Sequence, residues 1–376
     1  MSVPFNLDQG AQVTITDAEG GEPRRFEVVE RLASGARSQA WLARGWDGVY
    51  AVLKGPRAQG AQERELRIEE LILRQLRHDN LVRFIGAGRA EDGALLLASE
   101  RALPSPLELL TDPAIRAVFP DDPGTHYYPL PLPIAFGLAR DLAAGIAYMH
   151  QSGFAHHDVE PQNFMVRVES QRRVARPKKH QLLGEALQGS ARGVLIDIGA
   201  SRSLAYLRDL SAGREDPRLI PPQTTPLYAP PELLFEGRAP DGQLRRRHHP
   251  SLDCYAAALV IYSLLTGRLP YDHRRVDPRV ADELLNAKRA EGRGELSPID
   301  YEPLRRVPGL GAHADRVHGF LARCVSPRPE SRPHARDLAA FTSELQRGAA
   351  ATLRDARDPF FGSTAQERRP GRRGPG

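Results

Sequence analysis

The sequence has only two cysteines and no long hydrophobic run. Cys254 and Cys324 both lie in apolar segments of the 376-residue chain, so we expect two buried free thiols and no disulfide. The longest apolar run, AAALVIYSLL at 256–265, is about ten residues long, roughly half the length of a transmembrane helix. The first residues, MSVPFNLDQG, lack the charged start and apolar stretch of a secretory signal. These absences favour a cytoplasmic protein with no membrane partner.

Lysine is almost absent from the chain. It occurs at positions 54, 178, 179 and 288 alone, although 52 residues are Lys or Arg. A lysine within a strand usually does no more than protect a sheet edge from pairing. Here arginine fills nearly every other basic position, so a lysine kept in the apolar stretch AVLK is informative. Lys54 is therefore a candidate functional residue.

The net charge of +5 permits weak attraction to nucleic acid or acidic surfaces. The basic residues cluster in RRVARPKK at 172–179, RRRHH at 245–249 and RRPGRR at 368–373. None of these clusters is interleaved with aromatic residues, as a surface that stacks on bases would be. We therefore expect solvated loops, and a nucleic-acid partner stays a weaker alternative.

Short β-branched and aromatic runs predict a small β-rich lobe over residues 26–101. FEVVERLASG, QAWLARGW and VYAVLKG are separated by Gly and polar residues, which is typical of an antiparallel meander. One helical segment, EELILRQL, interrupts this pattern before strand character returns. Residues 1–25 form an N-terminal extension in which AQVTIT predicts one edge strand.

Helical periodicity dominates residues 102–346. The segment PIAFGLARDLAAGIAYMHQSG carries apolar residues at intervals of three and four. Residues 167–193 form a long polar loop that we expect to be an exposed docking or flexible segment, and residues 347–376 form a basic tail predicted to be disordered. The fold class is thus α+β, with a small β-rich N-lobe that holds one main helix and a larger, mostly helical C-lobe.

The stretch HHDVEPQN at 156–163 indicates metal-dependent phosphoryl transfer. It places Asp158 five residues before Asn163, and the later stretch VLIDIGAS places Asp197 before Gly199. Carboxylate and amide oxygens are suitable ligands for Mg²⁺. Ordinary turns could carry the same residues, but the two segments in this order favour a catalytic site.

The order of these motifs resembles that of the eukaryotic-type protein kinase family, over roughly residues 26–346. The resemblance implies a bilobal fold that binds ATP and Mg²⁺ between its lobes. Lys54 would hold the α and β phosphates, and Glu69 would be its partner on the helix, with Glu70 as the alternative.

The same resemblance assigns the remaining site residues. Asp158 would accept the proton of the substrate hydroxyl, and Asn163 and Asp197 would hold the metal. The resemblance also places residues around the nucleotide, namely Gly35 in the phosphate-covering loop and Glu100 and Ala102 in the hinge.

Three later segments resemble the branch of the family that phosphorylates proteins. TTPLYAPPELL would bring Thr225 to the catalytic loop, and its Glu232 would pair with Arg332 of SPRPESRP. The segment SLDCYAAALVIYSLLTGRLPY would form the central helix, which begins near Asp253. A protein substrate is therefore implied.

Several positions depart from the family pattern. The phosphate-covering loop reads ASGARS and keeps only Gly35 in register, Ile198 replaces a phenylalanine, and His157 replaces an arginine. Glu160 stands where a lysine usually faces the γ-phosphate. Like charges about 5 Å apart at an effective dielectric of ~20 repel by roughly 3 kcal/mol. We therefore expect Glu160 to act in the site by orienting a metal or by pairing with an arginine.

The sequence thus predicts a protein serine/threonine kinase. The alternative is a pseudokinase that serves as a nucleotide-binding or scaffolding module, which the broken Gly-rich loop and Glu160 favour. Retention of all five residues Lys54, Glu69, Asp158, Asn163 and Asp197 favours the enzyme. The sequence identifies neither the substrate protein nor the oligomeric state.

Overall fold

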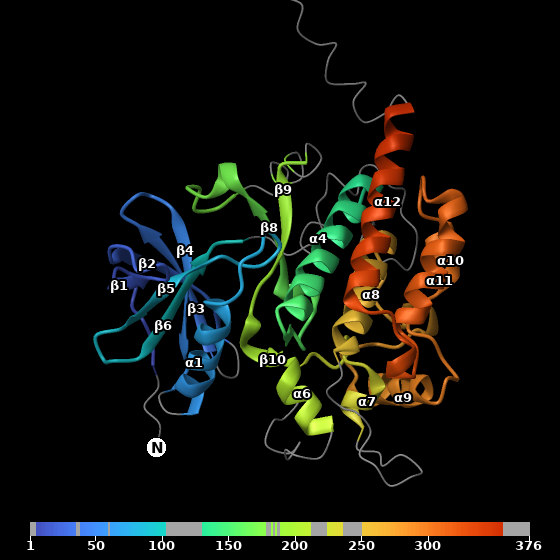
Figure 1. Cartoon of the computed structure of the whole chain (residues 1–376), viewed down its shortest axis with the longest axis horizontal. Helices are drawn as coiled ribbons and strands as arrows, with labels where there is room; N and C mark the ends of the chain where they lie inside the picture. The colour runs from blue at the N-terminus through green and yellow to red at the C-terminus, as the bar shows by residue number, and fades with distance from the viewer. Residues whose placement is uncertain are drawn as a thin grey trace, which may run out of the picture.

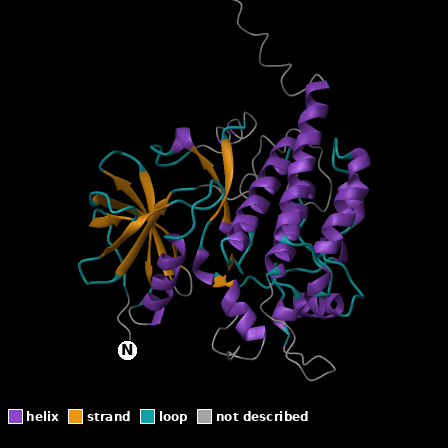
Figure 2. Ribbon diagram, in the orientation of Figure 1, coloured by secondary structure: helices purple, strands orange, loops and turns teal. Residues whose placement is uncertain are grey.

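A β-rich lobe and a helical lobe lie side by side (Figures 1 and 2). This computed structural model describes residues 5–34, 38–58, 61–102, 130–177, 182, 185, 189–211, 224–235 and 250–355. The predicted α+β class is confirmed.

Six antiparallel strands close the small lobe into a barrel, in the order β1-β2-β3-β4-β6-β5. Alternate side chains of each strand point inward, so Val28, Trp41 and Leu53 meet in a core that is fully or almost fully buried. Helix α1 packs against the outside of this barrel. The elements are β1 (Gln12–Asp17), β2 (Arg24–Ser34), β3 (Ser38–Gly45), β4 (Tyr50–Pro56), α1 (Ala61–Leu73), β5 (Phe84–Arg89) and β6 (Leu95–Glu100).

Strand β1 is part of the barrel and not the edge strand that was expected. It pairs with β2 on one side and with β5 on the other. A Cβ atom at Gly86 would lie 1.9 Å from the carbonyl oxygen of Thr16, and one at Gly88 would lie 2.2 Å from that of Thr14. Glycine at both positions lets β1 approach and close the barrel. The small lobe therefore begins before residue 26, and the described part of the predicted extension, residues 5–25, belongs to it.

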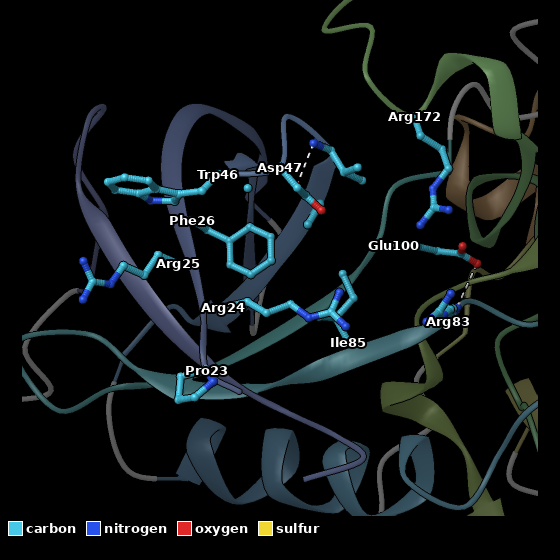
Figure 3. A pocket seen from close by; sticks show the side chains of 13 residues that line it. Pro23, Arg24, Arg25, Phe26, Trp46, Asp47, Arg83, Ile85, Glu100 and Arg172 are labelled. Atoms are coloured by element: carbon cyan, nitrogen blue, oxygen red, sulfur yellow. Dashed lines mark hydrogen bonds between the residues drawn. The ribbon is translucent and has the colours of Figure 1, made fainter. Parts of the chain in front are cut away.

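One end of the barrel opens into a hollow of about 530 Å³ beside the start of the hinge (Figure 3). Phe26 and Ile85 contribute apolar side chains to it, and Glu100 lies on the side of the hinge. This hollow is separate from the residues that the motifs single out.

The large lobe is built around the long helices α4 and α8, against which α12 packs. Every residue of α8 is buried, and Cys254 and Cys324 are buried free thiols, as predicted. In the described part of the chain, α4 is the one helix long and apolar enough to cross a membrane, yet it is mostly buried inside this lobe. The helices are α4 (Leu132–Gln151), α6 (Leu204–Ser211), α7 (Pro231–Leu234), α8 (Ser251–Thr266), α9 (Ala281–Gly292), α10 (Tyr301–Arg305), α11 (Ala314–Cys324) and α12 (Ala335–Asp355).

Short strands and single 3-10 turns connect the helices near the lobe boundary. Strand β8 pairs with β9 as an antiparallel hairpin, and β7 pairs with β10. The strands are β7 (Phe154–Ala155), β8 (Phe164–Val168), β9 (Ala191–Leu195) and β10 (Arg202–Ser203), and the 3-10 turns are η1 (Pro161–Asn163), η2 (Glu169–Gln171), η3 (Ile198–Ala200), η5 (Asp272–Arg274), η6 (Gly311–His313) and η7 (Pro329–Ser331).

Two expected boundaries in the large lobe are wrong. The ends of the loop predicted at 167–193 are strand residues of β8 and β9, and the described start of the insert is anchored to the small lobe. The N–H of Tyr50 donates to the carbonyl of Arg172 at 2.9 Å, and Arg101 donates to that of Val174 at 2.6 Å. Helix α12 continues to Asp355, so residues 347–355 are helical, and residues 356–376 lie outside the described part.

Candidate active site

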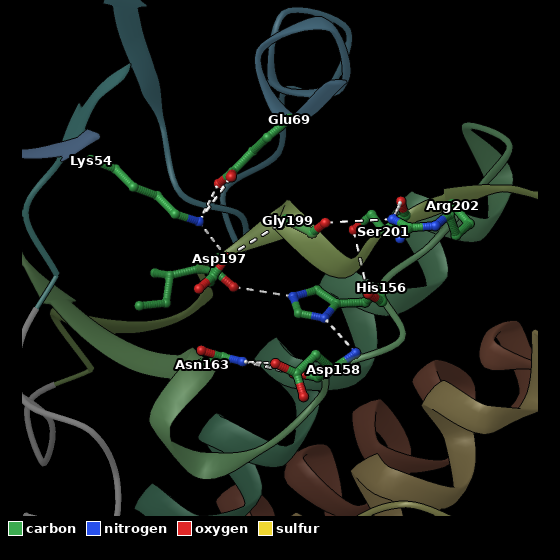
Figure 4. A network of polar contacts seen from close by, with 10 residues as sticks. Lys54, Glu69, His156, Asp158, Asn163, Asp197, Gly199, Ser201 and Arg202 are labelled. Atoms are coloured by element: carbon green, nitrogen blue, oxygen red, sulfur yellow. Dashed lines mark hydrogen bonds and ion pairs between the residues drawn. The ribbon is translucent and has the colours of Figure 1, made fainter. Parts of the chain in front are cut away.

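A lysine and two carboxylates meet where the small lobe faces the large lobe (Figure 4). Lys54 Nζ on β4 lies 2.8 Å from Glu69 Oε2 and 2.6 Å from Asp197 Oδ1. Burial disfavours the charged ammonium group, but the charges of Asp197 and Glu69 outweigh it and hold the pKa of Lys54 above its ordinary value. The triad therefore presents a fixed cation at the lobe boundary.

The geometry decides between the two candidate glutamates of α1. Glu69 is buried and pairs with Lys54, whereas Glu70 lies on the outer face of the helix and pairs with Arg74 at 2.9 Å. One helix position turns the side chain by about 100°, which separates the two roles. Burial raises the pKa of Glu69, and the Lys54 cation opposes that rise.

The HHDVEPQN stretch folds back on itself through side-chain hydrogen bonds. Asn163 Nδ2 donates to the backbone carbonyl of Asp158 at 3.0 Å and to its Oδ2 at 2.8 Å. His156 is buried and accepts from the Asp158 N–H at 3.3 Å through Nδ1. These contacts hold the Asp158 carboxylate in one orientation, and Figure 4 shows it below Asp197.

The other oxygen of Asp158 is the one available for chemistry. Oδ1 is buried and has no hydrogen-bond partner among the described residues. Burial raises the pKa of Asp158 to about 7, helped by the negative charges of Glu160 and Asp197. A buried, unpartnered carboxylate oxygen with a pKa near neutrality is suited to accept a proton from a bound hydroxyl group.

Asp253 at the start of α8 holds the catalytic loop in place. Its carboxylate accepts the N–H groups of His156 at 2.7 Å and of His157 at 2.8 Å, and it lies 2.8 Å from His150 Nε2. Burial alone would raise its pKa, but His150 and the neighbouring histidines lower it to about 2. The role of His150 was not predicted, because its position on α4 becomes informative only once α4 and α8 are packed together.

Two residues of the site have backbone conformations that side chains rarely adopt. His157 has φ 68° and Asp197 has φ 55°, both in the left-handed region. The Asp253 bond holds the first, and the Asp197 carboxylate accepts the N–H of Gly199 at 3.2 Å. Such strained positions concentrate at functional sites, where the surrounding contacts maintain them.

Glu160 has a hydrogen-bond partner that was not expected. A hydrogen bond joins its side chain to Thr225, and no ion pair of Glu160 with an arginine occurs among the residues that the structure describes. Burial raises the pKa of Glu160, the Thr225 hydrogen bond opposes that rise, and the charge of Asp197 adds to it. The expected arginine pair is therefore wrong for the described chain, and Glu160 instead ties the catalytic loop to the segment that carries Thr225.

Asn163 and Asp197 have the chemistry of a magnesium site. Asn163 uses Nδ2 to hold Asp158, which leaves its carbonyl oxygen for a metal, and the Asp197 side chain is 42% exposed. Mg²⁺ usually takes one or two protein oxygens and completes its shell with phosphates and water. The described residues contain no cluster of three or more His, Cys, Asp or Glu that could hold a metal.

A second buried network supports the segment after Thr225. Glu232 and Arg332 form a buried ion pair at 2.5 Å, as predicted. Lys288 on α9 is completely buried and donates to the carbonyl of Ala229 at 2.6 Å and to Tyr255 Oη at 3.0 Å. Sequence reasoning missed Lys288, although the scarcity of lysine that singled out Lys54 applied to it equally.

The expected nucleotide contacts are only partly described. Gly35 lies outside the described residues. Glu100 ends β6 at the hinge, and its carboxylate accepts from the Arg83 N–H at 3.0 Å and from Arg167 at 2.9 Å. Only the backbone at Glu100 and at the buried Ala102 is therefore left for a nucleotide.

Comparisons with known proteins agree with this geometry. The model of the protein kinase domain matches residues 26–341. CBL-interacting protein kinase 4 of Oryza sativa subsp. japonica is 28% identical over 85% of this chain and 58% of its own length. Probable serine/threonine-protein kinase fhkE of Dictyostelium discoideum is 24% identical over 75% of this chain and 34% of its own length. Serine/threonine-protein kinase 16 of Mus musculus is 24% identical over 86% of this chain and 91% of its own length.

The chain thus spans less than two thirds of the length of each of the first two relatives and most of the third. The domain model covers most of both lobes and every residue of the triad and the catalytic loop, although β1 lies before its start. The chain belongs to the protein kinase family.

Proposed function

We propose that this protein transfers the γ-phosphoryl group of ATP to serine or threonine hydroxyl groups of a protein substrate. The observation that carries the proposal is the Lys54–Glu69–Asp197 triad, assembled opposite a held Asp158 with one unpartnered carboxylate oxygen. This arrangement supports the proposal, because a cation for the phosphates, a carboxylate for the metal and a carboxylate that can accept a proton lie together.

The residues divide the work as follows. Lys54 would bind phosphate oxygens of ATP, and the backbone of Glu100 and Ala102 would hold the base. Asn163 and Asp197 would hold Mg²⁺, which neutralises charge on the phosphates. Asp158 accepts the proton of the substrate hydroxyl group while the hydroxyl oxygen forms a bond to the γ-phosphorus. The bond between the γ-phosphorus and ADP breaks, and ADP leaves.

Glu160 is the observation that favours a pseudokinase, because it puts a carboxylate where a cation is usual. The structure offsets this argument, since Glu160 has a defined partner in Thr225 and the triad is intact. A scaffold has no chemical need for Lys54, Glu69 and Asp197 in contact.

Transfer of labelled phosphate from ATP to serine- and threonine-containing peptides, with Mg²⁺ and with Mn²⁺, tests the proposal. The wild type and Glu295→Gln, which changes a surface carboxylate paired with Arg293, should be active. Asp158→Asn should lose about 10²–10⁴ in rate, and Asp197→Asn should abolish transfer. No transfer by the folded wild type with either metal would refute it.

A further inference from the structure

The hollow at the open end of the barrel has the charge and shape of a binding site. Its volume of about 530 Å³ lies within the range of about 300–1,000 Å³ typical of ligand pockets. The residues of the Lys54 triad and Asp158 do not line it. Figure 3 shows arginine side chains and an exposed indole around Phe26 and Ile85.

Two carboxylates line the hollow, and both are already engaged. Glu100 pairs with Arg167 at 2.9 Å and also accepts the Arg83 N–H. Asp47 accepts the N–H of Val49 at 3.0 Å within the β3–β4 turn. The charge of Glu100 is thus met by Arg167, whereas Asp47 keeps its negative charge, because a backbone N–H does not neutralise it. Among the described residues, neither carboxylate forms an ion pair with an arginine that lines the hollow.

Four arginines line the hollow, and two of them have carboxylate partners. Arg24 lies 2.7 Å from Asp17, and Arg172 lies 3.1 Å from Glu169. The Arg172–Glu169 pair is the more exposed of the two, with side chains 36% and 64% exposed, so its interaction is weak, whereas Asp17 is only 10% exposed and holds Arg24 more firmly.

The other two arginines leave an excess of positive charge. Neither Arg25 nor Arg83 forms an ion pair with any residue in the described ranges. The Arg25 guanidinium instead lies 6.0 Å from the ring centroid of Trp46, and Arg83 is exposed at the edge of the hollow. These fork-shaped donors match carboxylates in a bidentate geometry.

An apolar wall accompanies this charge. Phe26 is almost fully buried, whereas Trp46 is 76% exposed and is the most exposed large hydrophobic residue of the described chain. Ile85 completes the apolar surface between them. An exposed tryptophan beside unpaired arginines is the composition typical of protein-binding hot spots.

The inserted segment after β8 supplies one wall. Arg172 lines the hollow, and its carbonyl accepts from Tyr50 on β4, which holds the insert against the small lobe. Arg101 in the hinge donates to Val174 and lies over the Tyr50 ring at 5.5 Å. The hollow is thus formed by both lobes.

We propose that this hollow docks an acidic peptide segment of a partner protein, with one large apolar side chain between carboxylate residues. The apolar side chain would pack against Phe26, Ile85 and Trp46, and the flanking carboxylates would pair with Arg25 and Arg83. The phosphates of a nucleic acid would also pair with the arginines, but a nucleic acid has no apolar side chain to pack against the apolar wall.

The probe is a synthetic heptapeptide with one phenylalanine flanked on each side by three acidic residues, added to the full-length protein. Trp46 reports binding directly, because the other tryptophan, Trp41, is fully buried in the barrel. We expect a saturable change in tryptophan emission, which Trp46→Phe abolishes. Binding by isothermal calorimetry should weaken about tenfold for Arg25→Glu and for Arg83→Glu, the loss expected when a charge-assisted hydrogen bond is removed.

The matched control is Arg64→Glu, which reverses an exposed arginine of α1 outside the hollow and should bind like the wild type. A peptide with alanine in place of phenylalanine should bind about tenfold more weakly. No binding by the wild type, equal binding by Arg83→Glu, or tighter binding of a single-stranded RNA of the same charge would each overturn the proposal. None of these readouts requires phosphoryl transfer.

Discussion

Lys54 Nζ lies 2.6 Å from Asp197 Oδ1, a contact that joins the small lobe to the large lobe across 143 positions of sequence. Glu69 holds the same ammonium group from α1. The strand β4, the helix α1 and the segment of Asp197 therefore meet at one point of the lobe boundary.

Replacing Lys54 with methionine should remove the cation proposed to bind the phosphates while keeping most of the unbranched side chain. We expect phosphoryl transfer to fall by about 10²–10³, as when one preorganised electrostatic contact is lost. Steady-state transfer to a peptide measures the effect. Lys54→Arg should also be impaired, because the guanidinium fork does not fit a site built around a compact ammonium group. Wild-type rates in both variants would show that Lys54 has no part in transfer.

Lys288→Met should weaken peptide binding more than it slows the chemical step. Lys288 donates to the carbonyl of Ala229, directly before the segment that leads to Glu232, so its loss frees a backbone segment that the proposed function would place beside a peptide substrate. We expect the KM for peptide to rise several-fold while the KM for ATP stays constant. Lys288→Gln keeps a donor and should lose less. Equal increases in both KM values would indicate general loosening of the lobe.

The same lysine predicts a dependence of stability on pH. Burial lowers the pKa of Lys288 to about 8, from an ordinary value of 10.5. Between these values the unfolded chain binds more protons than the folded chain, so the free energy of unfolding should rise with pH. The free energy of unfolding should be measured with urea at pH 7 and at pH 9.5. Its change between these pH values should be more favourable for the wild type than for Lys288→Met. If the free energy of unfolding of the wild type gains no more over this pH range than that of Lys288→Met, then Lys288 keeps an ordinary pKa.

Gly86→Ala should destabilise the small lobe. The added Cβ would lie 1.9 Å from the Thr16 carbonyl oxygen, which forces β1 away from β5. We expect a loss of about 1–3 kcal/mol in the free energy of unfolding. Gly319→Ala on α11 is the control, since nothing lies within 4 Å of its Cβ and alanine favours a helix by up to ~1 kcal/mol. The melting temperature should fall for Gly86→Ala and rise for Gly319→Ala. Equal changes in the two variants would contradict the close approach of β1 to β5 that closes the barrel.

Motif order was sufficient to predict the triad and the catalytic loop, because Lys54, Asp158 and Asp197 keep the residue types and the order that the chemistry demands. The closure of the barrel and the partner of Glu160 depend instead on contacts between segments that are distant in sequence. The alternation in AQVTIT is the same for an edge strand and for one paired on both sides, so closure of the barrel depends on the glycines of β5. Likewise, nothing in HHDVEPQN specifies that Glu160 would meet Thr225, which lies 65 positions later.

The substitution Glu160→Lys tests most directly whether the site is competent as it stands. It restores the cation usual in the family but breaks the link to Thr225. Peptide phosphorylation should be measured for the wild type, Glu160→Gln and Glu160→Lys under identical conditions. The account predicts that the wild type is active and that Glu160→Lys does not raise turnover, because the bond of Glu160 to Thr225 holds the loop in place. A clear rise in turnover with lysine, approaching the hundredfold that roughly 3 kcal/mol of relieved repulsion would give, would contradict it.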